Sequence, residues 1–242
     1  MWTSGWFTAA LVMLVVALVA YLVRQAYHRR QLEKAKLETE RRHALEVAEL
    51  HLRTIEALAV AIDAKDNTTH QHLKRVMLCA EAIGQELRLT GDELRALRAA
   101  ALLHDIGKLA VPEYIISKPG RLTEEEFEKM KIHTVVGAEI LERVRFPYPV
   151  VPIVRSHHER WNGTGYPDGL KGIEIPIGAR ILAVVDSFDA LASDRQYRRA
   201  LTPREAIRAI QQAAGEDYDP FIVGILERIY TKIEAVITTA PQ

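Results

Sequence analysis

The sequence has 242 residues, enough for a membrane anchor and one domain with its own hydrophobic core. Lys and Arg number 32, as do Asp and Glu, so the formal net charge is zero and nothing in the composition favours binding to a nucleic acid polymer. The single cysteine, Cys79, excludes an internal disulfide and lies in an apolar stretch, which predicts a core residue in a reducing compartment.

Residues 1–23 contain no Asp, Glu, Lys or Arg and are long enough to cross a bilayer as a helix. Arg24, Arg29 and Arg30 follow at once, and the positive-inside rule then places the carboxyl-terminal bulk in the cytoplasm. A cleaved signal peptide carries its positive charge before the apolar stretch, which is the reverse of this order. We therefore predict one transmembrane helix over 1–23, in contact with lipid of the inner (cytoplasmic) membrane.

A helical linker is predicted over 24–53, and helix-favouring composition without Gly or Pro continues to residue 65. Apolar and small residues follow a heptad-like spacing there, which predicts either a coiled coil that joins two copies or an amphipathic helix that packs on its own domain. These residues are Leu45, Ala48, Leu52, Ile55, Ala59 and Ile62. A homodimer through the linker is therefore one of two open interpretations.

The rest of the chain predicts an all-α domain over 54–235, followed by a short tail over 236–242. Asp92 is expected to open a helix that reaches His104, and Thr123 to Glu126 form a capping box. Pro203 and Pro220 each follow a capping residue and mark two more helices. Residues 161–178 hold five Gly and two Pro, so an ordered loop is expected there.

His104 and Asp105 stand together at the end of the apolar helix, where they are either a hydrogen-bonded cap or the start of a metal site. A carboxylate has two oxygens and can bridge two metals about 3.5–4 Å apart. Further histidines and an acid lie in helical, apolar surroundings: His72, His133, His157, His158 and Asp186. Together they predict two divalent metal ions, and a ligand set without thiolate suits iron or manganese better than structural zinc.

This series resembles the HD-GYP family, the HD-domain metal phosphohydrolases that act on cyclic di-GMP, from about Thr54 to Ala206. The motifs that carry the resemblance are His72-Leu-Lys-Arg-Val76, Leu103-His-Asp-Ile-Gly-Lys108, Lys118-Pro-Gly-Arg-Leu-Thr123, His133, His157-His-Glu159, Asn162-Gly-Thr-Gly-Tyr-Pro167 and Asp186 to Arg198. The resemblance implies an HD-type helical bundle and a metal-dependent phosphodiesterase that hydrolyses cyclic di-GMP, with either linear pGpG or, after a second cleavage, GMP as the product.

The resemblance also implies roles for single residues. One metal would be held by His72, His104, Asp105 and Asp186, and the other by Asp105, His133, His157 and His158. Lys108 would lie with Asp105 at the reacting phosphate, while Tyr166, Arg195 and Arg198 would bind substrate. Thr68 stands where some members have a glutamate that binds a third metal, which favours two metals here; His70 is an alternative imidazole beside His72.

Two other functions compete with hydrolysis of cyclic di-GMP. The domain would be a catalytically silent receptor or interaction module if it bound cyclic di-GMP, or a diguanylate cyclase partner, without turnover. Alternatively it would hydrolyse another cyclic dinucleotide, such as cyclic GMP-AMP. None of the seven expected metal positions is lost, which favours catalysis.

Overall fold

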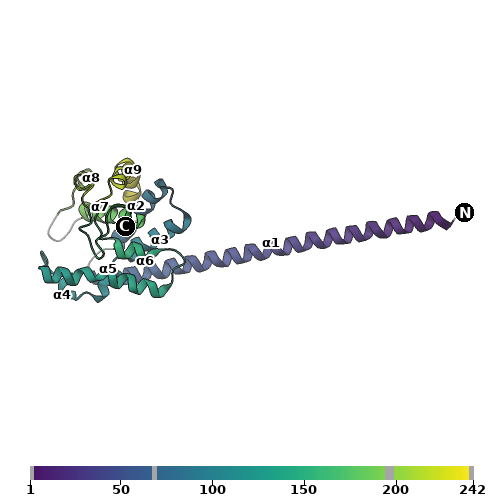
Figure 1. The fold of residues 1–242 in the computed structure, drawn as a ribbon, viewed down its shortest axis with the longest axis horizontal. Coiled ribbons are helices and arrows are strands. Elements are labelled where there is room, and N and C mark those ends of the chain that lie inside the picture. The colour runs from purple at the N-terminus through teal and green to yellow at the C-terminus, as the bar shows by residue number, and fades with distance from the viewer. Residues whose placement is uncertain (1–2, 67–69, 194–198, 240–242) are drawn as a thin grey trace. The chain divides into compact units, whose positions relative to one another are not determined.

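The computed structural model describes residues 3–66, 70–193 and 199–239, with side chains given except at 3–5, 8, 44–53, 55–70 and 231–239 (Figure 1). Two compact units are formed, Met1–Arg53 and Thr54–Gln242. Every regular element among the described residues is helical, as the composition predicts. The heptad-like side chains from Leu45 to Ile62 lie outside the described side chains.

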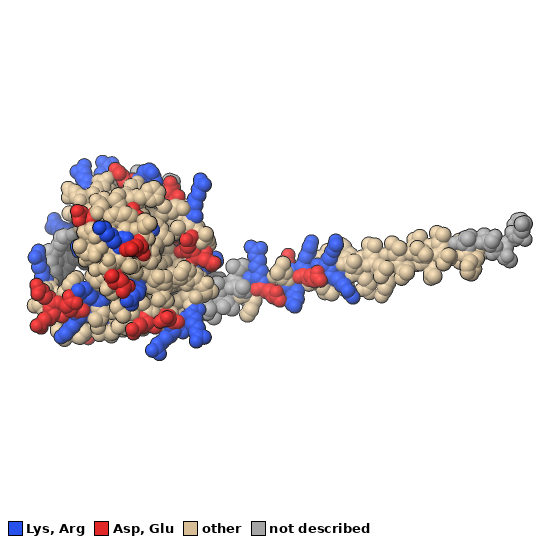
Figure 2. Space-filling model, viewed as in Figure 1, with Lys and Arg blue, Asp and Glu red and all other residues tan. Residues whose placement is uncertain are grey.

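The first unit is helical and belongs to α1 (Thr3–Asp66). Its apolar side chains are exposed from Trp6 (81%) to Val23 (62%). Figure 2 shows no charged side chains over this stretch, whereas both signs of charge follow it. The segment Ala9–His43 is long and apolar enough to cross a membrane by length and composition. Such a continuous apolar surface is unusual on a soluble protein.

The second unit is a bundle around α7, whose residues are apolar on almost every side. In this unit α2 packs against α3, α7 and α9, and α5 packs against α6 and the short 3-10 helix η1. The elements are α2 (His70–Glu86), α3 (Gly91–Leu103), η1 (Ile106–Ala110), α4 (Glu113–Ile116), α5 (Glu124–Val144), α6 (Val150–Ser156), η2 (Gly172–Glu174), α7 (Ile177–Ala192), α8 (Pro203–Gln212) and α9 (Pro220–Thr239).

The bundle core follows from helical periodicity. In α2, Leu73, Val76, Ala80 and Ile83 recur every three or four residues and are all buried. In α3, the run of alanines from Ala99 to Ala101 is fully buried, and small side chains let neighbouring helices approach closely. The buried apolar side chains of α7 are Ile181, Leu182, Val184, Val185 and Phe188. Each large one contributes about 1.5–3 kcal/mol through its burial.

Capping threonines set the starts of three helices, and one of these starts corrects the prediction. Thr123 and Thr202 form capping boxes that begin α5 and α8. For α3 the prediction was wrong by one or two residues: the cap is Thr90, whose hydroxyl accepts from the Glu93 amide while the Glu93 carboxylate accepts from the Thr90 amide. Asp92 therefore lies in the first turn rather than at the cap.

Candidate metal centre

The seven side chains expected to bind metal come from five helices or helix ends of the second unit. They are His72 in α2, His104 and Asp105 at the end of α3, His133 in α5, His157 and His158 at the end of α6, and Asp186 in α7. All the helices that carry them belong to the packed bundle, so the core fixes their mutual positions.

Three of the seven form a first cluster. One nitrogen or oxygen atom each of His72, His104 and Asp186 lies within 4.8 Å of the others. Both imidazoles direct Nε2 at the same carboxylate oxygen, because Asp186 Oδ1 lies 3.5 Å from His72 Nε2 and 4.0 Å from His104 Nε2. Two imidazoles and one carboxylate aimed at one point suit a three-ligand cation site.

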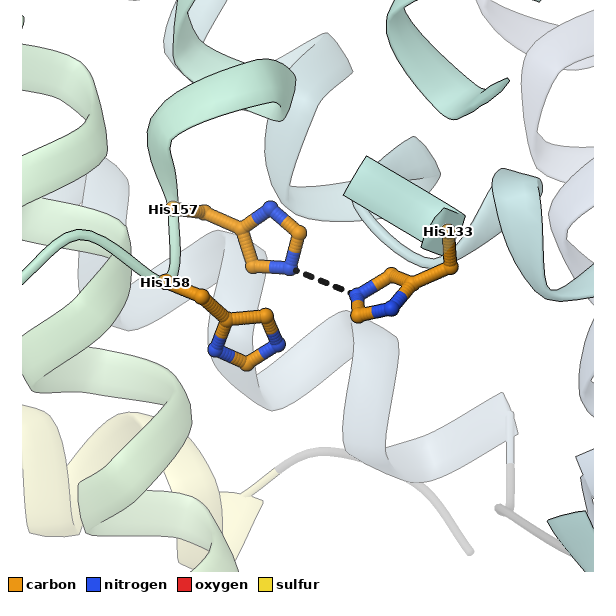
Figure 3. Close-up of side chains that lie close together, drawn as sticks. All are labelled: His133, His157 and His158. Carbon is orange, nitrogen blue, oxygen red and sulfur yellow. Dashed lines mark hydrogen bonds between the residues drawn. The ribbon is translucent and has the colours of Figure 1, made fainter. Parts of the chain in front are cut away.

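A second cluster consists of His133, His157 and His158, with ligand atoms again within 4.8 Å of one another. Figure 3 shows the three rings converging from α5 and from the end of α6. Adjacent helical residues diverge by about 100°, but α6 ends at Ser156, so His157 and His158 escape this constraint. Their ring centroids are 4.1 Å apart.

Asp105 lies between the two clusters. Its Oδ2 is 3.3 Å from His104 Nε2 in the first cluster, and its Oδ1 is 3.8 Å from His133 Nε2 in the second. One carboxylate therefore presents a separate oxygen to each cluster, which is the geometry of a bridging ligand. Lys108 Nζ lies 2.8 Å from Asp105 Oδ2 and brings a cation to the same place.

The imidazole hydrogen bonds leave Nε2 facing inward in four of the five histidines. His104, His133 and His157 each donate Nδ1–H to the backbone carbonyl three residues earlier, and His72 donates Nδ1–H to Asp189 Oδ2 at 2.7 Å. The three carbonyl distances are 3.0 Å to Ala101, 2.6 Å to Met130 and 2.6 Å to Val154. Second partners of this kind fix the tautomer of metal-ligating histidines.

The electrostatics of the second cluster call for a cation. Burial, with the neighbouring rings, lowers the pKa of His158 to about 3 and holds the pKa of His157 well below its usual value. Burial also lowers the pKa of His133. His133 and His157 are then neutral, each donates Nδ1–H to a backbone carbonyl, and their Nε2 atoms lie 3.4 Å apart. A metal ion here would accept both Nε2 lone pairs, so the residues present fit a metal.

The acidic side of the centre is also charged. Burial opposes ionisation of Asp105, yet Lys108 and His104 hold its pKa well below the usual value. Burial alone would lower the pKa of His104, but Asp105 and then Asp186 raise it to about 9. In the metal-free protein a proton on His104 therefore balances the carboxylates, and a bound cation would replace it.

Asp189 and Arg75 support His72 from behind, and no role for them was predicted from the sequence. Asp189 is buried, and Arg75 contacts both of its oxygens through Nε and Nη2. Arg75 Nη2 also donates to Ser193 Oγ at 2.9 Å. The signal was present: Asp189 is a second acid one turn after Asp186 in an apolar helix, and a buried carboxylate needs a partner.

Glu159 anchors the Gly-rich loop beside the centre. Its buried carboxylate accepts from the backbone amides of Asp168, Gly169 and Leu170 at 2.7–3.1 Å. Gly165 allows the loop to fold back, because a Cβ there would lie 2.3 Å from the Arg160 nitrogen. The loop was expected through residue 178, but it ends at Pro176, because α7 begins at Ile177, and it includes the short helix η2.

Close backbone contact also joins the metal-bearing elements. A Cβ on Gly107 in η1 would lie 1.8 Å from the carbonyl oxygen of His133 in α5. A cavity of about 130 Å³ adjoins the centre, and its lining includes His157, His158 and Asp186. A larger hollow of about 370 Å³ lies where α5 meets α6 and is lined by none of the seven residues.

The structure brings together all seven predicted metal ligands, together with Lys108 and Tyr166. The Tyr166 ring centroid lies 5.0 Å from that of His158 and 6.5 Å from that of His133. Arg195, Arg198 and Thr68 lie outside the described residues, as does the side chain of His70.

Comparisons with known proteins agree with this geometry. A model of the HD domain family matches residues 56–222. The chain is 42% identical over 186 residues to a cyclic di-GMP phosphodiesterase of Thermotoga maritima, covering 76% of this chain and 50% of that protein. It is 41% identical over 193 residues to the cyclic di-GMP phosphodiesterase response regulator RpfG of Xanthomonas campestris pv. campestris, covering 79% and 51%.

Among solved structures, a cyclic GMP-AMP specific phosphodiesterase of V. cholerae, V-cGAP3, superimposes with a TM-score of 0.60. Sequence identity is 22%, and the match covers 78% of this chain and 53% of that one, so it shows a shared fold. The chain spans about half the length of the two curated relatives described above.

Proposed function

The chain belongs to the HD domain family, in its HD-GYP subgroup, and from that premise we propose that it is a metal-dependent phosphodiesterase for cyclic di-GMP. The observation that carries the proposal is the pair of three-residue clusters with Asp105 between them. Two relatives above 40% identity that are named cyclic di-GMP phosphodiesterases support the substrate.

Two divalent cations fit the centre. His72, His104 and Asp186 would hold one, His133, His157 and His158 the other, and Asp105 would contribute an oxygen to each. Nitrogen and oxygen ligands without thiolate favour iron or manganese. Bound in this way, the two ions supply an activated water molecule and neutralise charge on a phosphate.

The remaining side chains orient and neutralise the substrate. Lys108 holds its ammonium 2.8 Å from Asp105, so a phosphate at the centre meets a fixed positive charge that stabilises the departing oxygen. Tyr166 offers a partly buried ring beside His158 for contact with the nucleotide. Arg195 and Arg198 complete the proposed phosphate contacts. Cleavage of one phosphodiester bond would give linear pGpG, and a second cleavage would give GMP.

The exposed apolar surface of α1 supports a location in the inner (cytoplasmic) membrane. One pass through the bilayer, with Arg24, Arg29 and Arg30 on the inner side, would leave the catalytic domain in the cytoplasm. Fractionation tests this: the full chain should stay with the membrane after alkaline carbonate washing. Its release into the supernatant would contradict the anchor.

The activity is tested on the full chain in detergent, loaded with iron or manganese under anaerobic conditions. We expect hydrolysis of cyclic di-GMP, with pGpG as the first product, and loss of turnover in Asp105→Asn. Asp92→Asn is the matched control, because Asp92 pairs with Arg95 on the surface of α3, so its activity should equal that of the parent. Binding of cyclic di-GMP without turnover in the metal-loaded parent would contradict the proposal and favour a receptor.

A further inference from the structure

A row of aromatic rings runs outward from the second histidine cluster. His158 is followed by Tyr166 at 5.0 Å between ring centroids, and Tyr166 by Phe127 at 5.9 Å. Tyr166 comes from the Gly-rich loop, whereas Phe127 lies in the first turn of α5. The row therefore joins the candidate metal centre to the molecular surface.

Phe127 is exposed at the outer end of this row. Its relative exposure is 45%, and it is neither in the buried core nor among the partly buried residues packed against the core. Its single described ring contact is the edge-to-face contact with Tyr166, at an interplanar angle of 87°. The exposed part of the ring is open to stacking with a flat ring of another molecule.

Lys131 places a cation over the two rings. Its Nζ lies 5.5 Å from the Phe127 centroid and 5.9 Å from the Tyr166 centroid, one turn along α5 from Phe127. The ammonium pairs with Glu128 Oε1 and has three hydrogens to donate. A ligand stacked on Phe127 would therefore find a hydrogen-bond donor near its edge.

Resting on the proposed function, we propose that Phe127 and Lys131 form the subsite for one nucleobase of the cyclic dinucleotide. Phe127 stacks on the face of the base, and Lys131 donates to an acceptor on its edge. Guanine presents O6 and N7 as two acceptors on one edge, whereas adenine presents N7 and an N6 amino group that donates. Lys131 therefore selects guanine.

The ring contacts support the placement. The Tyr166 centroid lies 5.0 Å from that of His158 and 5.9 Å from that of Phe127, so the centroids of Phe127 and His158 are at most about 11 Å apart. A nucleoside bridges such a distance, so its phosphate reaches the histidine cluster while its base lies on Phe127. Removing one stacked aromatic side chain typically weakens binding of a base by about tenfold or more.

The test measures kinetics and binding with the metal-loaded full chain in detergent. The substrates are cyclic di-GMP and bis(p-nitrophenyl) phosphate, which has no nucleobase. In Phe127→Ala we expect the ratio of kcat/KM for cyclic di-GMP to that for bis(p-nitrophenyl) phosphate to fall about tenfold or more, mainly through KM. Phe127→Tyr keeps the ring and should restore the ratio. Phe221→Ala is the matched control, because Phe221 is 64% exposed on α9 and makes no ring contact among the described residues.

Lys131→Met keeps the length of the side chain and removes its charge. It should reduce the preference for cyclic di-GMP over cyclic di-AMP, measured as the ratio of their dissociation constants, by about fivefold or more, since one good base contact is worth that much or more. An unchanged ratio would overturn the assignment of Lys131.

Failure of this subsite and failure of the proposed function give different results. If the parent hydrolyses or binds cyclic di-GMP and Phe127→Ala does so equally well, the subsite is wrong and the function stands. A fall of equal size on both substrates would make Phe127 a structural residue and also overturn the subsite. If the parent binds cyclic di-GMP without turnover, the dissociation constants of the variants still decide the subsite. A parent that does not bind cyclic di-GMP would overturn both.

Discussion

Replacing Asp189 with asparagine should weaken both the fold and the metal centre. The Asp189 side chain is 6% exposed and accepts from His72 Nδ1 at 2.7 Å and from Arg75 Nη2 at 2.9 Å. In Asp189→Asn, an NH2 group replaces one carboxylate oxygen and faces an N–H of His72 or Arg75. Two hydrogen-bond donors then face each other, so that contact turns from attractive to repulsive. The Arg75 guanidinium would also lose the carboxylate that balances its charge.

The size of the effect follows from burial. Breaking a buried ion pair costs about 3–5 kcal/mol, and Arg75, at 20% side-chain exposure, keeps some solvent, which favours the lower end. For a domain of this size about 3 kcal/mol lowers Tm by roughly 6–12 °C. Because His72 loses the partner that fixes its tautomer, metal affinity should fall about 10- to 100-fold.

Thermal unfolding and chelator competition measure the two effects on the same sample. Asp92→Asn is the control, because Asp92 and Arg95 also form an ion pair but their side chains are 64% and 55% exposed. The expected loss of unfolding free energy is below about 1 kcal/mol, and metal affinity should not change. If Asp189→Asn keeps the Tm and the metal affinity of the parent, the role given to Asp189 is wrong. Should the variant fail to fold, Ser193→Ala removes only a peripheral partner of the Arg75 and Asp189 pair and should give a smaller loss of the same kind.

Gly107→Ala should destabilise the protein by about 3 kcal/mol or more, because its Cβ would lie 1.8 Å from the His133 carbonyl, whereas Gly224→Ala in open space should be neutral or stabilising in urea unfolding. Glu159→Gln should speed hydrogen exchange of the Asp168, Gly169 and Leu170 amides by about tenfold or more. Glu174→Gln is the control, because it removes an exposed carboxylate from the same loop and should leave these three amides unchanged. Equal exchange rates in the parent and in Glu159→Gln would refute the role of Glu159 as the anchor of the loop. Because the pKa of His104 is raised to about 9, this side chain holds a proton in the metal-free protein at pH 7.5. Metal binding should therefore release about one proton, and metal affinity should rise with pH until about pH 9. Calorimetry in buffers of different ionisation enthalpy measures the proton release, and metal binding without proton release would contradict the prediction. Removing metal with a chelator should lower Tm, because a ligand at about 100 times its Kd stabilises the folded protein by about 2.7 kcal/mol. An unchanged Tm would mean that the fold does not depend on metal.

Much of the fold was predictable from local signals. The capping threonines Thr123 and Thr202 and the apolar periodicity predict helices that the structure confirms. The predicted start of α3 was wrong because Thr90 and Asp92 are both residue types that suit a helix terminus. The reciprocal hydrogen bonds between Thr90 and Glu93 decide in favour of Thr90. The HD-GYP resemblance was confirmed by the match to the HD domain family over residues 56–222 together with the two cyclic di-GMP phosphodiesterases that are more than 40% identical.

Only the candidate metal ligands themselves were predictable from the sequence, and not the residues that support them. Residue type identifies histidines and acids, but the partner behind each ring depends on tertiary packing. Asp189 reaches His72 across 117 residues of sequence, and no local pattern encodes that distance. The same holds for Phe127 and Tyr166, which meet only because the Gly-rich loop folds over α5. The contact between Phe127 and Tyr166 depends on long-range packing, which local helix patterns do not predict.

A metal titration tests whether two metals act together around Asp105. Metal-free full chain in detergent is loaded with increasing manganese or iron, and bound metal and cyclic di-GMP turnover are measured on each sample. We expect turnover to rise with the square of fractional occupancy, if the sites fill independently, and to reach its maximum at about two metals per chain. Full turnover with one metal per chain, or with none, would contradict it.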